Sequence, residues 1–334
     1  MTQGSRSSSV EPLSVRNIVS SGLQLHREKF KEYFPIALVA VGWSLLPVLG
    51  MIGLGLILAF IIGATQQLTA AFWISVYGGV ALIVLAVSCA GKSLVNSALI
   101  TRLAFGELKN EPEATTDARR FVDSRKWSFL VAQIWVWLMI FGPTLGFYLV
   151  ARQITSSADV GFIEGLLLLL IQLILLSFVL MVFDGNFTGV SLLLIVVVTI
   201  AGSFWLSARL FAAEVPLAVE PEMLTLPFVQ RFWSLTKGNV WRVFAVLLIT
   251  FLITLPIFII AQSFSTIPQG LVLGLLRNNP DTLAIGDALS TLTRFATSLL
   301  FSVLVLPLWQ IIKTVVYYDL RTRQKGLGLK LRDH

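Results

Sequence analysis

The sequence predicts an all-α protein: a polytopic transmembrane helix bundle with six spans, one irregular or re-entrant segment, and amphipathic interfacial helices. Three observations lead to this fold class. The 334-residue chain is 56% hydrophobic and only 13% charged, about half the charged fraction of an average soluble protein. Its apolar residues gather in seven long runs, and its basic residues gather between those runs.

Each apolar run is long enough to cross a bilayer as a helix. About 20 residues, rising 1.5 Å each, cover roughly 30 Å of hydrocarbon. No connector between the runs is long enough for a separate soluble catalytic domain. The runs lie at about 35–62, 69–90, 127–151, 162–183, 189–211, 242–262 and 294–317.

The basic residues mark one side of the membrane. Lys and Arg are held on the cytoplasmic side during insertion, so clusters of them predict cytoplasmic segments. Both ends of the chain are basic, which predicts that both termini face the cytoplasm. A net charge of +7 spread in this way does not predict nucleic-acid binding. All but four of the 25 Lys and Arg fall in segments 1–34, 102–126, 209–242 and 313–334.

The number of runs and the positions of the charges disagree in one place. Three runs separate the basic segments that end at 126 and begin at 209, although an even number of crossings is needed. Either one of these runs is re-entrant or interfacial, or 209–242 lies outside. We favour the first alternative. Run three contains Gly142-Pro143, where proline removes an intrahelical hydrogen bond, and the turn at 184–189 offers a second place for a hairpin tip.

The domain organisation follows from the same pattern. Residues 1–13 are small and polar and predict a disordered tail. Residues 14–330 predict a single helical membrane domain, which can alternatively be divided into three diverged repeats of about 14–110, 113–220 and 221–330. After Ser14, a favourable N-cap, apolar residues recur near helical spacing up to Phe30, which predicts an amphipathic helix at the membrane surface.

No catalytic, cofactor or metal site is predicted, and the chain is interpreted as not an enzyme. The only cysteine is Cys89, and the two histidines, His26 and His334, are too few and too peripheral for a metal cluster or a serine–histidine pair. No carboxylate lies in the middle of a run, which argues against a proton-coupled transporter. Glu164 and Asp184 lie at run ends, and Glu214 and Glu220 follow run five in a loop that contains Pro216 and Pro221. Polar residues expected to hydrogen-bond between helices are Asn96, Gln133, Gln172 and Ser207.

Two strings resemble a known family. They are RFWSLTKGNVWRV at 231–243 and VVYYDLRTRQKGL at 315–327. Both resemble bacterial integral membrane proteins named after the membrane domain of glycerophosphoryl diester phosphodiesterase, and cyanobacterial members are especially similar. The resemblance implies the membrane module alone, because His26-Arg27 is followed by Glu28 rather than the glycine of the hydrolase motif. It also implies the bacterial inner membrane, or the thylakoid membrane for a cyanobacterial protein.

The first string supplies the candidate lipid-headgroup contacts: Arg231, Trp233, Lys237, Trp241 and Arg242. Trp233 and Trp241 are eight residues apart, nearly on one helical face, and suit the aromatic belt of a membrane surface. Lys237 and Arg242 are placed to meet lipid phosphates. Gly238-Asn239 offers a bend between a surface helix and a span. The alternative is that these residues only orient the helix.

These observations favour a non-enzymatic multi-pass membrane protein that organises lipids or partner proteins. The expected partners are membrane lipids, anionic ones in particular, and no cofactor is expected. One alternative is a transporter or channel for a small or lipid-like solute. A less favoured one is an intramembrane enzyme.

Overall fold

The computed structural model describes residues 14–65, 67–155, 201–221, 227–276 and 283–332. Every regular element in these ranges is a helix, which confirms the all-α fold class. The long helices are α1 (Val15–Thr65), α2 (Leu68–Leu108), α9 (Val240–Leu276) and α10 (Leu283–Arg332). The shorter ones are α3 (Thr115–Asp123), α4 (Lys126–Thr155), α7 (Val215–Val219) and α8 (Pro227–Thr236). Residues 201–210 are also helical.

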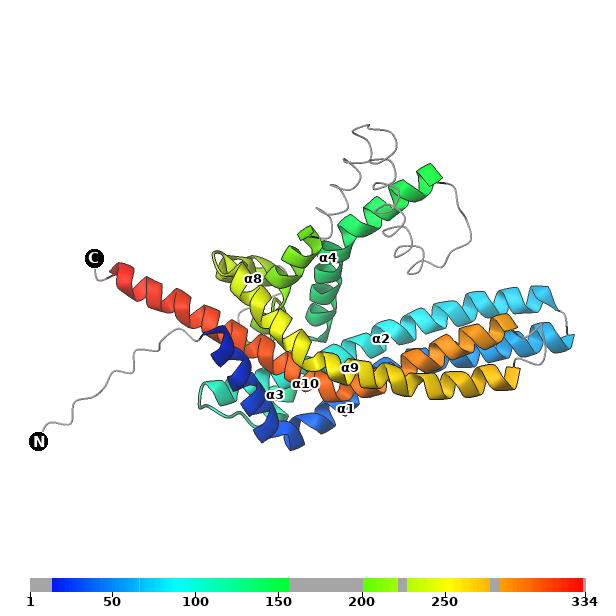
Figure 1. Ribbon diagram of the computed structural model, residues 1–334, viewed down its shortest axis with the longest axis horizontal. Coiled ribbons are helices and arrows are strands. Elements are labelled where there is room, and N and C mark those ends of the chain that lie inside the picture. The colour runs from blue at the N-terminus through cyan, green and yellow to red at the C-terminus, as the bar shows by residue number, and fades with distance from the viewer. Residues whose placement is uncertain (1–13, 66, 156–200, 222–226, 277–282, 333–334) are drawn as a thin grey trace, which may run out of the picture.

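Four helices are long and apolar enough to cross a membrane. They are α1, α2, α9 and α10, which contain predicted runs one, two, six and seven. α1 packs on α2 and α9 packs on α10, so that two long hairpins lie side by side (Figure 1). The described part of the chain is therefore an all-helical assembly with four candidate membrane spans.

The remaining runs were expected to hold two further spans and the irregular segment. Run three lies in α4, which continues as a helix through Gly142 and Pro143, where an interruption was predicted. The ribbon of α4 changes direction part of the way along (Figure 1), and proline is the usual cause of a sharp kink. Run three therefore bends without breaking. Run four, the turn at 184–189 and the tail at 1–13 lie outside the described residues, and the count of six spans stays a prediction.

The first part of α1 differs from its expected setting. The backbone N–H of Asn17 donates to Ser14 Oγ at 3.2 Å, so Ser14 caps the helix as predicted. The apolar side chains of Ile18 and Val19, however, are buried within the protein. At Gly22 the backbone of α1 lies so close to Ile312 of α10 that a Cβ atom would collide with that side chain. The amphipathic start of α1 thus covers α10 with its apolar face.

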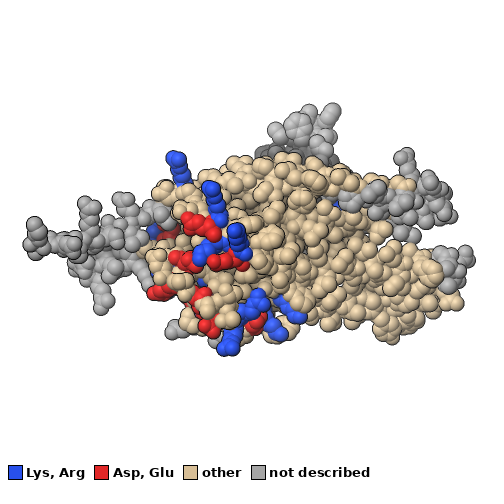
Figure 2. All heavy atoms as spheres, turned by 90° about the horizontal axis from the view of Figure 1, so that it is seen from below, with Lys and Arg blue, Asp and Glu red and all other residues tan. Residues whose placement is uncertain are grey.

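The charged side chains of the described residues lie mostly at one end of the molecule. Figure 2 shows Lys, Arg, Asp and Glu gathered over this end, while the rest of the visible face carries almost none. The first turn of α1 and the last turn of α10 both lie there (Figure 1). The described ends of the chain are therefore on one side of the spans, as the basic termini predicted. We call this region the charged end.

The tightest packing is also at the charged end. Leu99 and Ile100 of α2, Phe232 of α8, and Ile311 and Tyr317 of α10 have no exposed surface. On the spans, by contrast, large apolar side chains such as Phe60 and Ile83 are more than half exposed. The charged end is therefore packed like the core of a soluble protein, and the spans present an apolar surface of the kind that lipid covers.

Candidate functional site at the charged end

The five residues predicted to contact headgroups do not share one helix. α8 ends at Thr236, and Lys237 to Asn239 form a turn before α9 begins at Val240. Gly238 has a φ of +81°, in the left-handed region that favours glycine. The bend predicted at Gly238-Asn239 is therefore present. Because of it, Trp233 and Trp241 belong to different helices and do not form one aromatic face.

Two of the predicted headgroup contacts are ion-paired inside the protein. Arg242 Nη2 lies 3.3 Å from Oδ2 of Asp319, an α10 carboxylate whose side chain is only 3% exposed. Arg231 Nη2 lies 3.9 Å from Glu220 Oε1. These arginines hold α9 and α8 against the rest of the charged end.

Of the other three predicted residues, two are exposed and one packs against the protein. Lys237 is exposed, and Trp241 is 80% exposed. Trp233 instead packs at the core, with the guanidinium of Arg209 at 3.9 Å from its ring centroid. Arg209 also lies 4.9 Å from the ring of Trp205 and donates to the carbonyl oxygen of Trp233 at 3.3 Å. Lys237 and Trp241 are therefore the members of the set that can meet a lipid surface.

Glu220 is the centre of a second charged cluster. Tyr317 Oη donates to Glu220 Oε1 at 2.6 Å, and Arg321 Nη1 lies 3.5 Å from the same oxygen. Arg231 is the third group around it. This carboxylate thereby joins the end of the α7 segment to α8 and to α10.

The short helix α7 is held in place by arginines from the other side. Arg125 Nη1 donates to the carbonyl oxygens of Leu217 at 3.3 Å and Glu220 at 2.9 Å. Arg102 donates to the carbonyl oxygen of Ala218 at 3.2 Å. These bonds satisfy carbonyl groups at the end of α7 that have no helical partner. Burial, together with the neighbouring charge of Arg102, lowers the pKa of Arg125, although a guanidinium stays protonated at any physiological pH.

Arg102 is further fixed by a carboxylate and a ring. Its Nε and Nη2 atoms donate to the two oxygens of Glu113 at 2.7 and 2.9 Å, which is a bidentate pair. Its guanidinium also lies 3.7 Å from the ring centroid of Phe121 in α3. The end of α2, the connector after it and α3 are thus joined through one side chain.

A third polar cluster connects α4 and α10. Lys313 Nζ donates to Glu214 Oε1 at 2.6 Å. With its NH₂ group turned toward Glu214, the amide of Gln133 donates to Oε2 at 3.2 Å and accepts from Trp137 Nε1 at 2.6 Å. The interhelical role predicted for Gln133 fits this contact. In contrast, Asn96 and Ser207 donate to carbonyl oxygens of their own helices, at Lys92 and Ser203.

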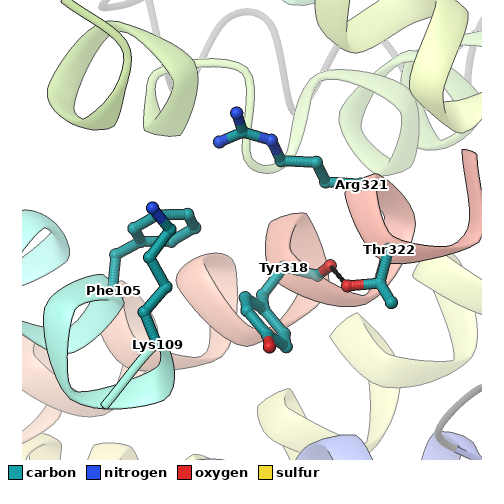
Figure 3. A pocket seen from close by; sticks show the side chains of 5 residues that line it. All are labelled: Phe105, Lys109, Tyr318, Arg321 and Thr322. Atoms are coloured by element: carbon teal, nitrogen blue, oxygen red, sulfur yellow. Dashed lines mark hydrogen bonds between the residues drawn. The ribbon is translucent and has the colours of Figure 1, made fainter. Parts of the chain in front are cut away.

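A hollow of about 270 Å³ opens beside the Glu220 cluster, between the end of α2 and residues 318–322 of α10. Its walls are Phe105, Lys109, Tyr318, Arg321 and Thr322 (Figure 3). No local sequence pattern predicts this site, because its residues come from segments more than 200 positions apart. The only local signal was the gathering of basic residues in 102–126 and 313–334.

The described residues contain no group of three or more His, Cys, Asp and Glu side chains that could hold a metal ion. Comparison with known proteins gives no relative: no family model, no curated protein and no solved structure matches the chain. The family resemblance of 231–243 and 315–327 stays a prediction.

Proposed function

We propose that this chain is a non-enzymatic multi-pass protein of a bacterial inner membrane that gathers anionic lipids around its charged end. The observation that carries the proposal is the pairing of basic side chains with tryptophan rings at the ends of apolar runs. Tryptophan, lysine and arginine are the residues that anchor helices at the headgroup level.

Three such pairs occur in the described residues. Lys92, at the end of run two, lies 3.8 Å from the ring centroid of Trp43 in α1. Lys126 lies 5.6 Å from the ring of Trp127 where run three begins. Arg209 lies 4.9 Å from the ring of Trp205, which is 41% exposed, at the end of run five. A ring beside a cation gives each pair an amphipathic surface that suits the boundary between headgroups and hydrocarbon.

Lys237 and Trp241 supply a further basic side chain and a further indole ring at the start of α9. The exposed indole of Trp241 can enter the interface, and Lys237, four residues earlier in the turn, can reach a phosphate. One basic residue near an anionic leaflet contributes about 1 kcal/mol. The proposal therefore describes enrichment of anionic lipid by several weak contacts.

The apolar half of the protein supports lipid binding over transport of a small ion. A recess of about 350 Å³ lies between α9 and α10. Its walls are mainly apolar, with Ile257, Phe258 and Leu306 among them, although Ser298, Ser302 and Gln310 contribute polar atoms. Such a lining suits an acyl chain better than a hydrated ion. For the alternative function, transport, the expected cargo is a lipid-like solute.

Retention of lipid by the purified protein tests the proposal. We expect the double variant K237Q/W241A to lose phosphatidylglycerol relative to the wild type when both are extracted from the same membranes. The variant K237R/W241F keeps a charge and a ring and should retain the lipid. W73A removes an exposed ring from the opposite end of α2 and serves as the control. Equal phosphatidylglycerol in all four proteins would refute the proposal.

A further inference from the structure

We propose that the hollow formed by Phe105, Lys109, Tyr318, Arg321 and Thr322 binds a phosphate ester. This site is separate from Lys237 and Trp241, so it does not depend on the proposed lipid function. Figure 3 shows Lys109 and Arg321 approaching the same open space from α2 and α10, with the ring of Tyr318 below them.

The two cations at the hollow are only partly neutralised. Arg321 has one carboxylate contact, at 3.5 Å to Glu220, and Glu220 also serves Tyr317 and Arg231. The Nε atom of Arg321 is buried and has no hydrogen-bond partner among the described residues.

Lys109 is held still more loosely. Its Nζ lies 3.8 Å from Glu111, whose side chain is 76% exposed, and a water-exposed pair of this length is weak. Together with Arg321, it places two cations in the walls of the hollow.

Phosphate fits this donor set better than a carboxylate does. Arginine presents a planar fork that matches two phosphate oxygens, and lysine supplies a point charge for a third. Arg321 and Lys109 come from different helices, so together they can contact an ion that presents oxygens in several directions. The Thr322 hydroxyl donates to the carbonyl oxygen of Tyr318 at 2.8 Å, which leaves its own oxygen as an acceptor for a ligand hydroxyl.

The rest of the hollow suits an organic group attached to the phosphate. A volume of about 270 Å³ is many times the roughly 10–15 Å³ that one water requires by the same kind of measure. Two of its walls are aromatic, with the rings of Phe105 and Tyr318 at 6.1 Å between centroids and 70° apart. A small organic part can pack on these rings while the phosphate meets the cations.

The position of the hollow favours a ligand that comes from water. Lys313 is the first charged residue of α10 after Arg294, and Arg321 follows eight residues later, which is about 12 Å along a helix. A headgroup layer is only about 5–7 Å deep on each side of the hydrocarbon. A soluble phosphate ester reaches this depth directly. A phospholipid headgroup carries the same chemistry and is the second source to be tested.

Binding of phenyl phosphate to the full chain in phosphatidylcholine nanodiscs tests the site. We expect saturable binding in equilibrium dialysis, with inorganic phosphate as a weaker competitor because it lacks the ring. K109Q and R321Q should each raise the Kd at least about tenfold, the loss expected for one charged hydrogen bond. The matched controls are K31Q and R323Q. Lys31 is an exposed lysine away from the hollow, and Arg323 is 25% exposed against 26% for Arg321.

Two results would overturn the site: no saturable binding by the wild type, or equal weakening in the control variants. R321Q also removes a partner of Glu220, so its folding must be checked by thermal unfolding. K109Q leaves the Glu220 cluster intact, and an unchanged Kd in K109Q alone would suffice to reject the proposal.

A second set of nanodiscs, made of equal parts phosphatidylcholine and phosphatidic acid, distinguishes a lipid headgroup from a soluble phosphate ester as the ligand. If phosphatidic acid displaces phenyl phosphate from the wild type, the site takes a lipid headgroup. If it does not, the ligand is soluble. The same K109Q protein should retain phosphatidylglycerol normally, which separates this site from the proposed lipid function.

Discussion

The phenol of Tyr317 donates a hydrogen bond of 2.6 Å to the carboxylate of Glu220, 97 residues earlier in the chain. Tyr317 is fully buried, and the same carboxylate faces Arg321 and Arg231. This contact therefore fixes α10 to the α7 segment within a cluster that has one anion and two cations.

Replacement of Glu220 should destabilise the charged end more than replacement of Tyr317. We expect Y317F to lower the free energy of unfolding by about 1.5–3 kcal/mol, the value of a hydrogen bond to a charged group. E220Q should cost about 2–4 kcal/mol, because it leaves two partly buried arginines without their anion. Thermal unfolding in detergent measures both, and E111Q, at an exposed acid, is the control. If E220Q were as stable as the wild type, the cluster would not stabilise the charged end.

Arg242 and Asp319 should show energetic coupling. The pair joins α9 to α10 at 3.3 Å, and Arg323 contacts the same Asp319 oxygen at 3.0 Å. In a double-mutant cycle of R242Q and D319N, we expect a coupling energy of about 1–3 kcal/mol. K237Q, at the exposed turn, should leave stability unchanged. Additive effects of R242Q and D319N would show that the pair does not hold the helices together.

Gly22 should tolerate alanine only if Ile312 is shortened. A Cβ at position 22 collides with Cδ1 of Ile312, and overpacking of this kind typically costs about 1–3 kcal/mol. I312V removes that methyl group. We therefore expect G22A to lower the unfolding midpoint and G22A/I312V to recover part of the loss. G42A is the control, because a Cβ there meets open space. Failure of I312V to rescue G22A would contradict the close approach of α1 to α10.

Gly238 should resist replacement by residues with a Cβ. Its φ of +81° disfavours L-residues, so G238A should cost roughly 1–2 kcal/mol, and G238N less, because asparagine tolerates this region better. The same measurement on G270A, at a helical glycine with open space around it, provides the comparison. If G238A and G238N were equally stable, the turn between α8 and α9 would differ from the structure.

Topology is tested by cysteine labelling in a variant that lacks Cys89. The basic balance of the charged end predicts that it faces the cytoplasm. Cysteines introduced at Lys31 and Lys237 should resist impermeant reagents in intact cells. A cysteine at Gln67, in the connector between α1 and α2, should be labelled from outside. Labelling at Lys31 or Lys237 would place the charged end outside the cell.

Local sequence patterns predicted the features that depend on local physics. Length and apolar content were sufficient to predict the four candidate spans in α1, α2, α9 and α10, because a helix in lipid must satisfy its own backbone. The bend at Gly238-Asn239 was predicted because glycine beside asparagine is typical of a helix end. Ser14 was predicted as an N-cap because a serine oxygen can accept a hydrogen bond from a backbone N–H of the first helical turn.

These patterns did not predict the contacts at the charged end. Residues around Pro216 were interpreted as a loop, yet Val215 and Leu217 of α7 are completely buried. A helix of five residues has too few positions to show a period, and its burial depends on α2 and α10. Arg231 and Arg242 were assigned to lipid because a basic residue beside an apolar run has the same sequence signature whether its partner is a phosphate or a buried acid.

The continuity of α10 has a mechanical consequence. One unbroken helix runs from the apolar spans into the charged end, where its last turns carry Tyr317, Asp319 and Arg321. Each residue of an α-helix advances the azimuth by about 100°. One residue inserted near Leu300 would therefore rotate Tyr317, Asp319 and Arg321 together away from Glu220 and Arg242. Conversely, a rotation of the apolar half of α10 would reach the hollow beside Arg321 through the turn that contains Pro307, where the helix lacks one backbone hydrogen bond.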